Sequence, residues 1–195
     1  MPLPRPRALL FDMDGTLTAP MLDFPAIKRD LGIGNRPILE AIAEMNPPEK
    51  AAAHAILDQH EQRAASASTL NPGCDQLLSW ITHQQIPTAI ITRNSRPCAQ
   101  TVLARHNLSF QVVITREDAR FKPDPAPLLL ACQKLNVSPS HAWMIGDGQY
   151  DIEAGLAAHI KTIWLSHSNP KPFPAEPWKT MPDLIALTKL LQDAE

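Results

Sequence analysis

The sequence has few cysteines, and their arrangement excludes two common uses of this residue. Cys74, Cys98 and Cys132 are odd in number, lie far apart, and form no C-x-x-C pair. A disulfide framework and a thiolate metal site both require paired or closely spaced cysteines. We therefore expect a reduced cytoplasmic protein in which these residues serve as small buried hydrophobic side chains.

A strong charge bias and long apolar runs are absent as well. The 195 residues include 18 Lys and Arg against 20 Asp and Glu, a formal net charge of −2. This balance lacks the basic footprint of a protein that binds nucleic acid or an anionic membrane surface. No apolar stretch approaches the roughly 20 residues needed to span a bilayer, and Asp12 ends the first apolar run too early for an export signal. We expect neither nucleic acid nor a membrane as partner.

Glycine is scarce, whereas proline is abundant. The 7 glycines are about half of the usual share, and the 20 prolines are about twice the usual share. Gly15, Gly146, Gly148 and Gly155 all lie within a few residues of an aspartate. The positions of these glycines therefore indicate that the loops containing the aspartates have special backbone requirements.

The chain alternates apolar runs with helical segments. The apolar runs lack the polar alternation of a half-exposed strand, which is typical of parallel sheets covered on both faces. Strands alternating with helices of about 10 to 15 residues predict an α/β fold with a doubly wound parallel sheet. The predicted strands are 7–12, 87–92, 110–114, 142–147 and 160–165, and the predicted helices between them are 73–84, 96–106, 125–136 and 149–159.

Two stretches depart from this alternation. Residues 19–70 contain no convincing strand, and amphipathic patterns predict helices over 24–31, 37–45 and 48–65. We interpret them as a small helical cap inserted after the first strand, so that residues 1–18 and 71–195 form the α/β core. Residues 169–182 hold five prolines and are expected to be irregular and extended, followed by a closing helix over 183–192.

Acidic residues follow two of the predicted strands. Asp12 and Asp14 stand two positions apart, so both side chains project to one side of an extended backbone, and Gly15 permits a tight turn behind them. Asp147 and Asp151 follow another strand and begin the next helix. Each pair alone could simply favour a helix N-terminus. Four carboxylates at one sheet edge, however, would repel one another and require a cation, for which Mg²⁺ is suited.

Other residues could hold an anion in front of these carboxylates. Thr92 offers a hydroxyl and neighbouring backbone N–H groups at a strand-to-helix turn, and Lys122 lies in a proline-stiffened loop. Alone, Thr92 would be a helix cap and Lys122 a solvated lysine. Their order on successive strand ends favours a shared site, and we take Thr92, Arg93, Asn94 and Lys122 as candidate substrate-binding residues.

With these motifs the sequence resembles the haloacid dehalogenase-like hydrolase superfamily, and within it the phosphatases similar to phosphoglycolate phosphatase. The resemblance covers residues 1–18 and about 71–168 of the predicted core. It implies a Mg²⁺-dependent phosphatase that hydrolyses a small phosphomonoester, phosphoglycolate-like or a sugar phosphate, through an aspartyl-phosphate intermediate. The four motifs, in the order of the family, are D-M-D-G-T-L-T at 12–18, Thr92 closing I-I-T, Lys122 before Pro123, and G-D-G-Q-Y-D at 146–151.

The resemblance also implies roles for the acids. Asp12 would be the nucleophile, and Asp14 the general acid for the leaving alcohol and later the base for water. Mg²⁺ would be held by Asp12, the carbonyl of Asp14 and Asp147, with Asp151 in support. Dehalogenases, phosphonate-cleaving members and ion-pumping ATPases of the superfamily lack an acid at the position of Asp14, so its presence implies a phosphate ester. Because Asp14 is a crowded carboxylate, we expect its pKa to be raised.

For the basic and hydroxyl side chains, the resemblance implies that Thr92 and Lys122 bind the phosphoryl oxygens and that Lys122 orients Asp12. Arg93 stands where relatives often have Asn, so it either alters the pocket or is solvated. His159 stands where relatives usually have Gly, which implies a left-handed backbone. Basic residues of the cap could bind a carboxylate on the leaving group; they are Lys28, Arg29, Arg36 and Arg63.

Two alternatives remain open. One is a mutase of the same superfamily, which passes the phosphoryl group to a sugar. The other is a non-catalytic phospho-acceptor module like the response-regulator receivers, which also use acids, Thr, Lys and Mg²⁺. In receivers the phosphorylated aspartate lies on a middle strand, and no cap is inserted. Asp12 lies on the first predicted strand and is followed by the insertion, which favours the hydrolase. We expect a small phosphorylated metabolite as partner and a monomer or homodimer.

Overall fold

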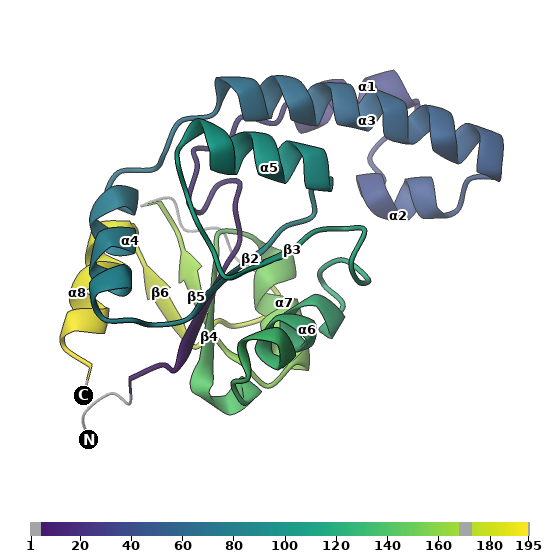
Figure 1. Ribbon diagram of the computed structural model, residues 1–195. Coiled ribbons are helices and arrows are strands. Elements are labelled where there is room, and N and C mark those ends of the chain that lie inside the picture. The colour runs from purple at the N-terminus through teal and green to yellow at the C-terminus, as the bar shows by residue number, and fades with distance from the viewer. Residues whose placement is uncertain (1–4, 168–172, 195) are drawn as a thin grey trace.

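Six parallel strands form the centre of the protein (Figure 1). The computed structural model describes residues 5–167 and 173–194. The strand order is β3-β2-β1-β4-β5-β6, and the doubly wound parallel sheet predicted from the sequence is confirmed. The strands are β1 (Ala8–Phe11), β2 (Thr88–Ile91), β3 (Val112–Ile114), β4 (Ala142–Gly146), β5 (Lys161–Leu165) and β6 (Lys179–Met181).

Helices cover both faces of this sheet, which explains the apolar strands. Every residue of β1, β2 and β4 is buried. Along β1, Leu9 and Phe11 pack in one layer, and Ala8 and Leu10 pack in the opposite layer. The first layer contains α4 (Cys74–His83), α5 (Arg96–Arg105) and α8 (Leu184–Gln192), and the second contains α6 (Ala126–Leu135) and α7 (Gln149–Ala157); a short 3-10 helix, Pro139–His141, precedes β4.

The three cysteines lie inside these layers. Cys74, Cys98 and Cys132 are all buried, and none is in a disulfide. Burial raises the pKa of Cys98 to about 11, so this thiol stays protonated at neutral pH and is a poor nucleophile. The expectation of buried hydrophobic cysteines is confirmed.

The order of the strands reverses between β1 and β4. The chain moves outward from β1 through β2 to β3 on one side and from β4 through β5 to β6 on the other. In open α/β sheets, a crevice for ligands forms beyond the carboxyl ends of the strands at such a switch point. Phe11 pairs with Ile145 across the two strands, so the residues that follow them are brought to one edge.

Three further helices lie between β1 and α4 in sequence and beyond the sheet in space, in the upper part of Figure 1. They contain an apolar cluster of their own that includes Ile27, Ile42 and Leu57. The longest of them packs along α5. These cap helices are α1 (Phe24–Leu31), α2 (Ile38–Ala43) and α3 (Pro47–Ala67).

Local sequence signals set the ends of two cap helices. The Asp23 side chain accepts a hydrogen bond from the backbone N–H of Ala26 at 2.9 Å where α1 begins, and Gly32, with a φ of 66°, caps the end of α1. The Asn46 side chain accepts from the N–H of Glu49 at 3.1 Å where α3 begins. Such capping satisfies backbone groups that have no partner within the helix.

The C-terminal segment contains a strand that the sequence analysis did not predict. Residues 169–182 were expected to be irregular, but β6 pairs with β5, with Met181 opposite Leu165. The backbone N–H of Trp178 also donates to the carbonyl of Thr162 at 2.9 Å. A three-residue strand without an apolar run forms here because β5 offers unpaired backbone groups at its edge. Residues 168–172 lie outside the described residues.

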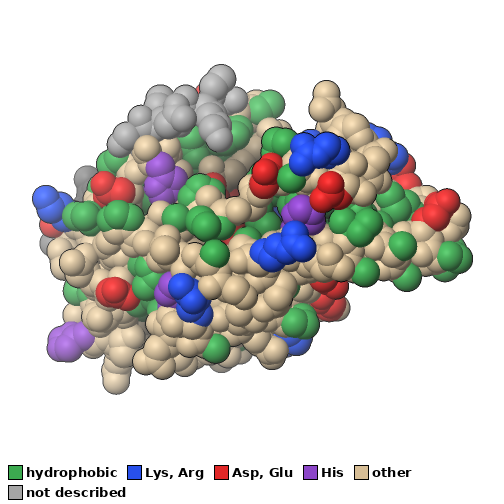
Figure 2. All heavy atoms as spheres, turned by 90° about the horizontal axis from the view of Figure 1, so that it is seen from above, with side chains coloured by type: hydrophobic (Ala, Val, Ile, Leu, Met, Phe, Trp, Pro, Cys, Tyr) green, Lys and Arg blue, Asp and Glu red, His purple; other side chains and the backbone are tan. Residues whose placement is uncertain are grey.

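Charged side chains of both signs are interspersed on the face that Figure 2 shows. On the described part of that face, no broad basic area of the kind that binds a polyanion stands out. Between residues 5 and 167 and between 173 and 194, no helix combines the length and the apolar character needed to cross a bilayer.

Candidate active site

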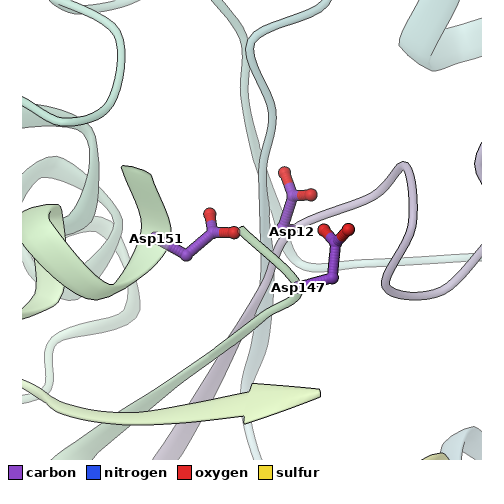
Figure 3. Close-up of side chains that lie close together, drawn as sticks. All are labelled: Asp12, Asp147 and Asp151. Atoms are coloured by element: carbon purple, nitrogen blue, oxygen red, sulfur yellow. The ribbon is translucent and has the colours of Figure 1, made fainter. Parts of the chain in front are cut away.

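Three carboxylates meet at the sheet edge where β1 and β4 end (Figure 3). Asp12 directly follows β1, Asp147 directly follows β4, and Asp151 lies in the first turn of α7. One oxygen of each lies within 4.8 Å of the others, and Figure 3 shows Asp12 and Asp147 side by side with Asp151 turned toward them. The structure thus brings together three of the four acids that the sequence analysis singled out.

The fourth acid, Asp14, is held beside this group by different partners. Its Oδ2 accepts a hydrogen bond from Asn94 Nδ2 at 2.6 Å, and its Oδ1 accepts from the Thr18 hydroxyl at 3.4 Å. Burial raises the pKa of Asp14, and the hydrogen bonds from Asn94 and Thr18 oppose this effect. The raised pKa agrees with the expectation, and burial is its main cause.

Lys122 is buried, with only 2% of its surface exposed. Its ammonium donates to Asp12 Oδ1 at 2.6 Å, to Asp151 Oδ1 at 2.6 Å and to the carbonyl of Ile91 at 2.7 Å. All three ammonium hydrogens are therefore engaged. Burial acts to lower the pKa of Lys122, but Asp12 and Asp151 outweigh it, so the pKa is raised and the charge is retained. The alternative interpretation of Lys122 as a solvated surface lysine is therefore wrong.

The three carboxylates share a single ammonium, and the pKa values of Asp12 and Asp147 are raised. Burial is the main cause that raises the pKa of Asp12 well above its ordinary value; Lys122 opposes the shift, and the charges of Asp151 and Asp147 add to it. Burial, followed by the charge of Asp151, raises the pKa of Asp147 to about 6. A divalent cation would stabilise the ionised carboxylates, and their hard oxygen donors suit Mg²⁺. The residues present therefore fit a magnesium site.

Two glycines allow the acids to approach so closely. Gly15 has a φ of +81°, and a Cβ atom there would lie 2.2 Å from Asp147 Oδ2. A Cβ atom on Gly146 would lie 2.2 Å from Asp151 Cγ. Both contacts are far below van der Waals distance, so no larger residue fits without displacing the carboxylate. These positions explain why scarce glycines occur beside aspartates.

Thr92 and Asn94 follow β2 and form the opposite rim of the site. The backbone N–H of Thr92 continues the sheet by donating to the carbonyl of Ile114 at 2.9 Å. Its hydroxyl oxygen accepts from the N–H of Asn94 at 3.1 Å. Both residues are buried and line the same cavity as the acids. The predicted anion-binding positions are thus next to the predicted acids.

Arg93, in contrast, is engaged with the cap. Its Nη2 donates to both carboxylate oxygens of Glu40 in α2, each at 3.0 Å, and its Nη1 donates to the carbonyl of Lys122. The guanidinium lies 4.8 Å from the ring centroid of Phe121 and 4.4 Å from that of Tyr150. Arg93 lines the cavity but connects core and cap, so its charge is balanced by Glu40.

A second contact between cap and core was missed by the sequence analysis. Glu61 in α3 is only 3% exposed. Its Oε1 lies 2.5 Å from Arg116 Nη1, and its Oε2 accepts from the N–H of Ser95 at 3.2 Å. Arg116 also binds Asp58 at 2.5 Å. No local motif marks this pair, because its members lie 55 residues apart and an acid on a helix is usually solvated.

A cavity of about 490 Å³ lies between the acids and the cap helices. Four basic residues of the cap were proposed to bind a carboxylate of the substrate. Among the described residues that line the cavity, Lys28 is the one that belongs to this set. Arg36 is instead paired with Glu44. The lining residues contributed by the cap are Pro20, Met21, Leu22, Phe24, Ile27, Lys28, Pro37, Ile38, Leu39, Leu57 and Glu61.

Known proteins resemble this chain in sequence and in fold. A family model for haloacid dehalogenase-like hydrolases matches residues 6–159. The chain is 31% identical to an N-acetylmuramic acid 6-phosphate phosphatase of Pseudomonas aeruginosa, over 81% of this chain and 80% of that protein. It is 27% identical to a phosphoglycolate phosphatase of Psychrobacter arcticus, over 82% and 83%. A solved hydrolase structure from Pseudomonas syringae shares the fold with a TM-score of 0.81 at 21% identity, over 96% and 99% of the chains.

Proposed function

Since this chain belongs to the haloacid dehalogenase-like hydrolase family, we propose that it is a Mg²⁺-dependent phosphatase that hydrolyses a small phosphomonoester through an aspartyl-phosphate intermediate. Relatives named as phosphatases of N-acetylmuramic acid 6-phosphate and phosphoglycolate support the reaction class. The observation that carries the proposal is the convergence of Asp12, Asp147 and Asp151 at one edge of the sheet, with the buried ammonium of Lys122 bound to Asp12 and Asp151.

Asp12 is the proposed nucleophile. Lys122 holds its Oδ1 at 2.6 Å, which fixes the carboxylate, and Asp12 lines the cavity. A carboxylate held in this way can attack phosphorus and form an acyl phosphate. We propose that Thr92 and Asn94 bind the phosphoryl oxygens, joined by Lys122 when a phosphoryl oxygen replaces one of its three present hydrogen-bond partners.

Mg²⁺ would be held by Asp12, Asp147 and the carbonyl of Asp14. When bound, the ion would neutralise the charge of the carboxylates and the phosphoryl group. Both oxygens of Asp151 already accept hydrogen bonds, from Lys122 at 2.6 Å and from the N–H of Gly148 at 3.0 Å. These hydrogen bonds favour an indirect role for Asp151, in which it helps to hold the metal site in place without binding the ion itself.

Asp14 is the proposed general acid. Its raised pKa favours a carboxyl group that carries a proton for the departing alcohol. Asn94 orients it at 2.6 Å, beside the three other carboxylates. After the alcohol leaves, ionised Asp14 can accept a proton from the water that attacks the aspartyl phosphate.

The cap helices are the proposed substrate-selective part of the protein. We assign residues 19–70 to the cap and residues 1–18 and 71–195 to the core, with the Arg93–Glu40 and Arg116–Glu61 pairs joining the two. A cap over the site would exclude water and contact the leaving group. The unpaired buried cysteines support a reducing compartment such as the cytoplasm.

The test is phosphate release from a panel of phosphorylated metabolites. We expect turnover that EDTA abolishes and Mg²⁺ restores, and an Asp12→Asn variant at least about a thousandfold slower. Asp75→Asn, at an exposed acid in α4, is the matched control and keeps its activity. Metal-independent turnover, or an Asp12→Asn variant with most of its activity, contradicts the proposal. Transfer of the phosphoryl group to a sugar in place of water would identify a mutase.

A further inference from the structure

The wall of the cavity that faces the carboxylates is apolar. It is formed by side chains of the cap, among them Ile38 and Leu39 in α2 and Leu57 in α3. Leu39 and Leu57 also belong to the apolar cluster of the cap. The phosphoryl end of the cavity is therefore polar, whereas the end that would receive the leaving group is mostly hydrocarbon.

Glu61 and Arg93, two charged side chains on this side of the cavity, already have partners of opposite charge. Glu61 is paired with Arg116 at 2.5 Å, and Arg93 is paired with Glu40 at 3.0 Å. Lys28 uses one of its three ammonium hydrogens in a hydrogen bond to the carbonyl of Asn35, at 3.2 Å. Lys28 could contact a carboxylate or a hydroxyl of the leaving group, but against the apolar wall such a group would lose more hydrogen bonds to water than it gains.

The rim of the cavity exposes two large hydrophobic side chains. Met21 is 44% exposed and Phe24 is 54% exposed, and both line the cavity. Most large hydrophobic residues are buried in this protein. An apolar ligand that covers Met21 and Phe24 would remove their surface from water, which is favourable.

From the apolar wall and rim, we propose that the substrate is the phosphomonoester of an apolar alcohol, with an alkyl or aryl body that lies against Leu39, Leu57 and Phe24. This inference rests on the proposed phosphatase function and specifies its substrate class. It differs from the phosphoglycolate-like substrate expected from the basic residues of the cap. Phosphoglycolate and polyol phosphates are poorer substrates on this account.

The first test compares ethyl, butyl and hexyl phosphate with the Mg²⁺-loaded protein, measured as phosphate release. These primary alcohols are similar leaving groups, so differences in kcat/KM report contacts with the alkyl chain. Burial of a methylene corresponds to about a three- to fourfold change, so we expect about a tenfold rise from butyl to hexyl phosphate. Phosphoglycolate and glycerol phosphate should be slower than butyl phosphate. A flat or falling alkyl series, or phosphoglycolate as the best substrate, overturns the inference.

The second test uses the rim. Met21→Ser and Phe24→Ser should each lower the ratio of kcat/KM for hexyl over ethyl phosphate by about fivefold, because exposed hydrocarbon is lost. The matched control is Leu156→Ser, at a residue of α7 that is 50% exposed but does not line the cavity. The ratio should be unchanged in this control. An unchanged ratio in both rim variants overturns the inference.

The two proposals fail in different ways. Hydrolysis of phosphate esters without a preference for apolar alcohols overturns the substrate class alone. If the protein hydrolyses no phosphomonoester of the series or the metabolite panel, the phosphatase proposal fails, and the substrate class fails with it.

Discussion

The ammonium of Lys122 and the carboxylate of Asp12 form a 2.6 Å hydrogen bond although 110 residues separate them in the sequence. The same ammonium lies 2.6 Å from Asp151. Lys122 thus supplies a positive charge among the carboxylates of the site. The proposed nucleophile, Asp12, depends on this ammonium for its orientation.

Lys122→Met should therefore lower both activity and stability. We expect kcat/KM to fall by at least about a hundredfold, as when a charged group that stabilises a transition state is removed. The free energy of unfolding should fall by about 3 kcal/mol, because Asp12 and Asp151 lose their partner in a buried site. Steady-state kinetics and urea unfolding measure the two effects. Lys134→Met, at an exposed lysine of α6, should change neither, and wild-type activity in Lys122→Met would refute this role.

Asp14→Asn should be sensitive to the leaving group. If Asp14 donates a proton to the departing alcohol, its loss slows hydrolysis of alkyl phosphates by about 10² to 10⁴. A nitrophenyl phosphate, whose leaving group needs no proton, should be slowed much less in the step that releases nitrophenol. Burst-phase kinetics with both esters provides the comparison. Equal losses for both esters would show that Asp14 is not the general acid.

The buried pair of Glu61 and Arg116 predicts a stability change that depends on pH. Burial raises the pKa of Glu61, and Arg116 opposes this shift. In Arg116→Met the pKa of Glu61 rises further. Because this pKa is raised in the folded state, stability is retained below the ordinary pKa of Glu61 and is lost as the pH rises through the folded value. We expect Arg116→Met to lower the free energy of unfolding by about 3 to 5 kcal/mol at pH 8 and by less at pH 5.

Urea unfolding of wild type and variant at the two pH values checks this sign. The control is the double variant Arg116→Met/Glu61→Gln, in which no buried carboxylate remains at position 61. It should recover part of the stability and lose the extra pH dependence. A larger cost at pH 5 than at pH 8 would contradict the argument.

His159 occupies a backbone conformation that favours glycine. Its φ is 56°, as the sequence analysis expected, and its side chain is exposed. A side chain in this region is strained, so His159→Gly should raise the free energy of unfolding by about 0.5 to 1 kcal/mol. His83→Gly, at the end of α4, should lower it. Chemical denaturation tests both, and a destabilised His159→Gly would show that the imidazole makes a contact that outweighs the strain.

Most of the fold could be predicted because each element carries a local signal. α1 spans the residues that its amphipathic pattern predicted, and the buried central strands appear as apolar runs. β6 could not be predicted, because K-T-M has no such pattern and the strand depends on pairing with β5. Its formation is a tertiary effect.

The acids of the site could be located from the sequence because parallel strands end at one edge. Asp12 and Asp147 follow neighbouring strands, so strand order alone brings them together. The partners of Arg93 and Arg116 could not be found in this way. Glu40 and Glu61 lie on cap helices, and the placement of the cap on the core has no local sequence signal.

The most direct measurement of the central claim is the identification of the residue that carries the phosphoryl group. In Asp14→Asn, nitrophenyl phosphate should still phosphorylate the protein, while attack by water is slowed because the proposed base is missing. After acid quenching, mass spectrometry should find one phosphoryl group per chain, on Asp12, and none in Asp12→Asn/Asp14→Asn. A phosphoryl group on another residue, or continued turnover without any covalent intermediate, would contradict the account.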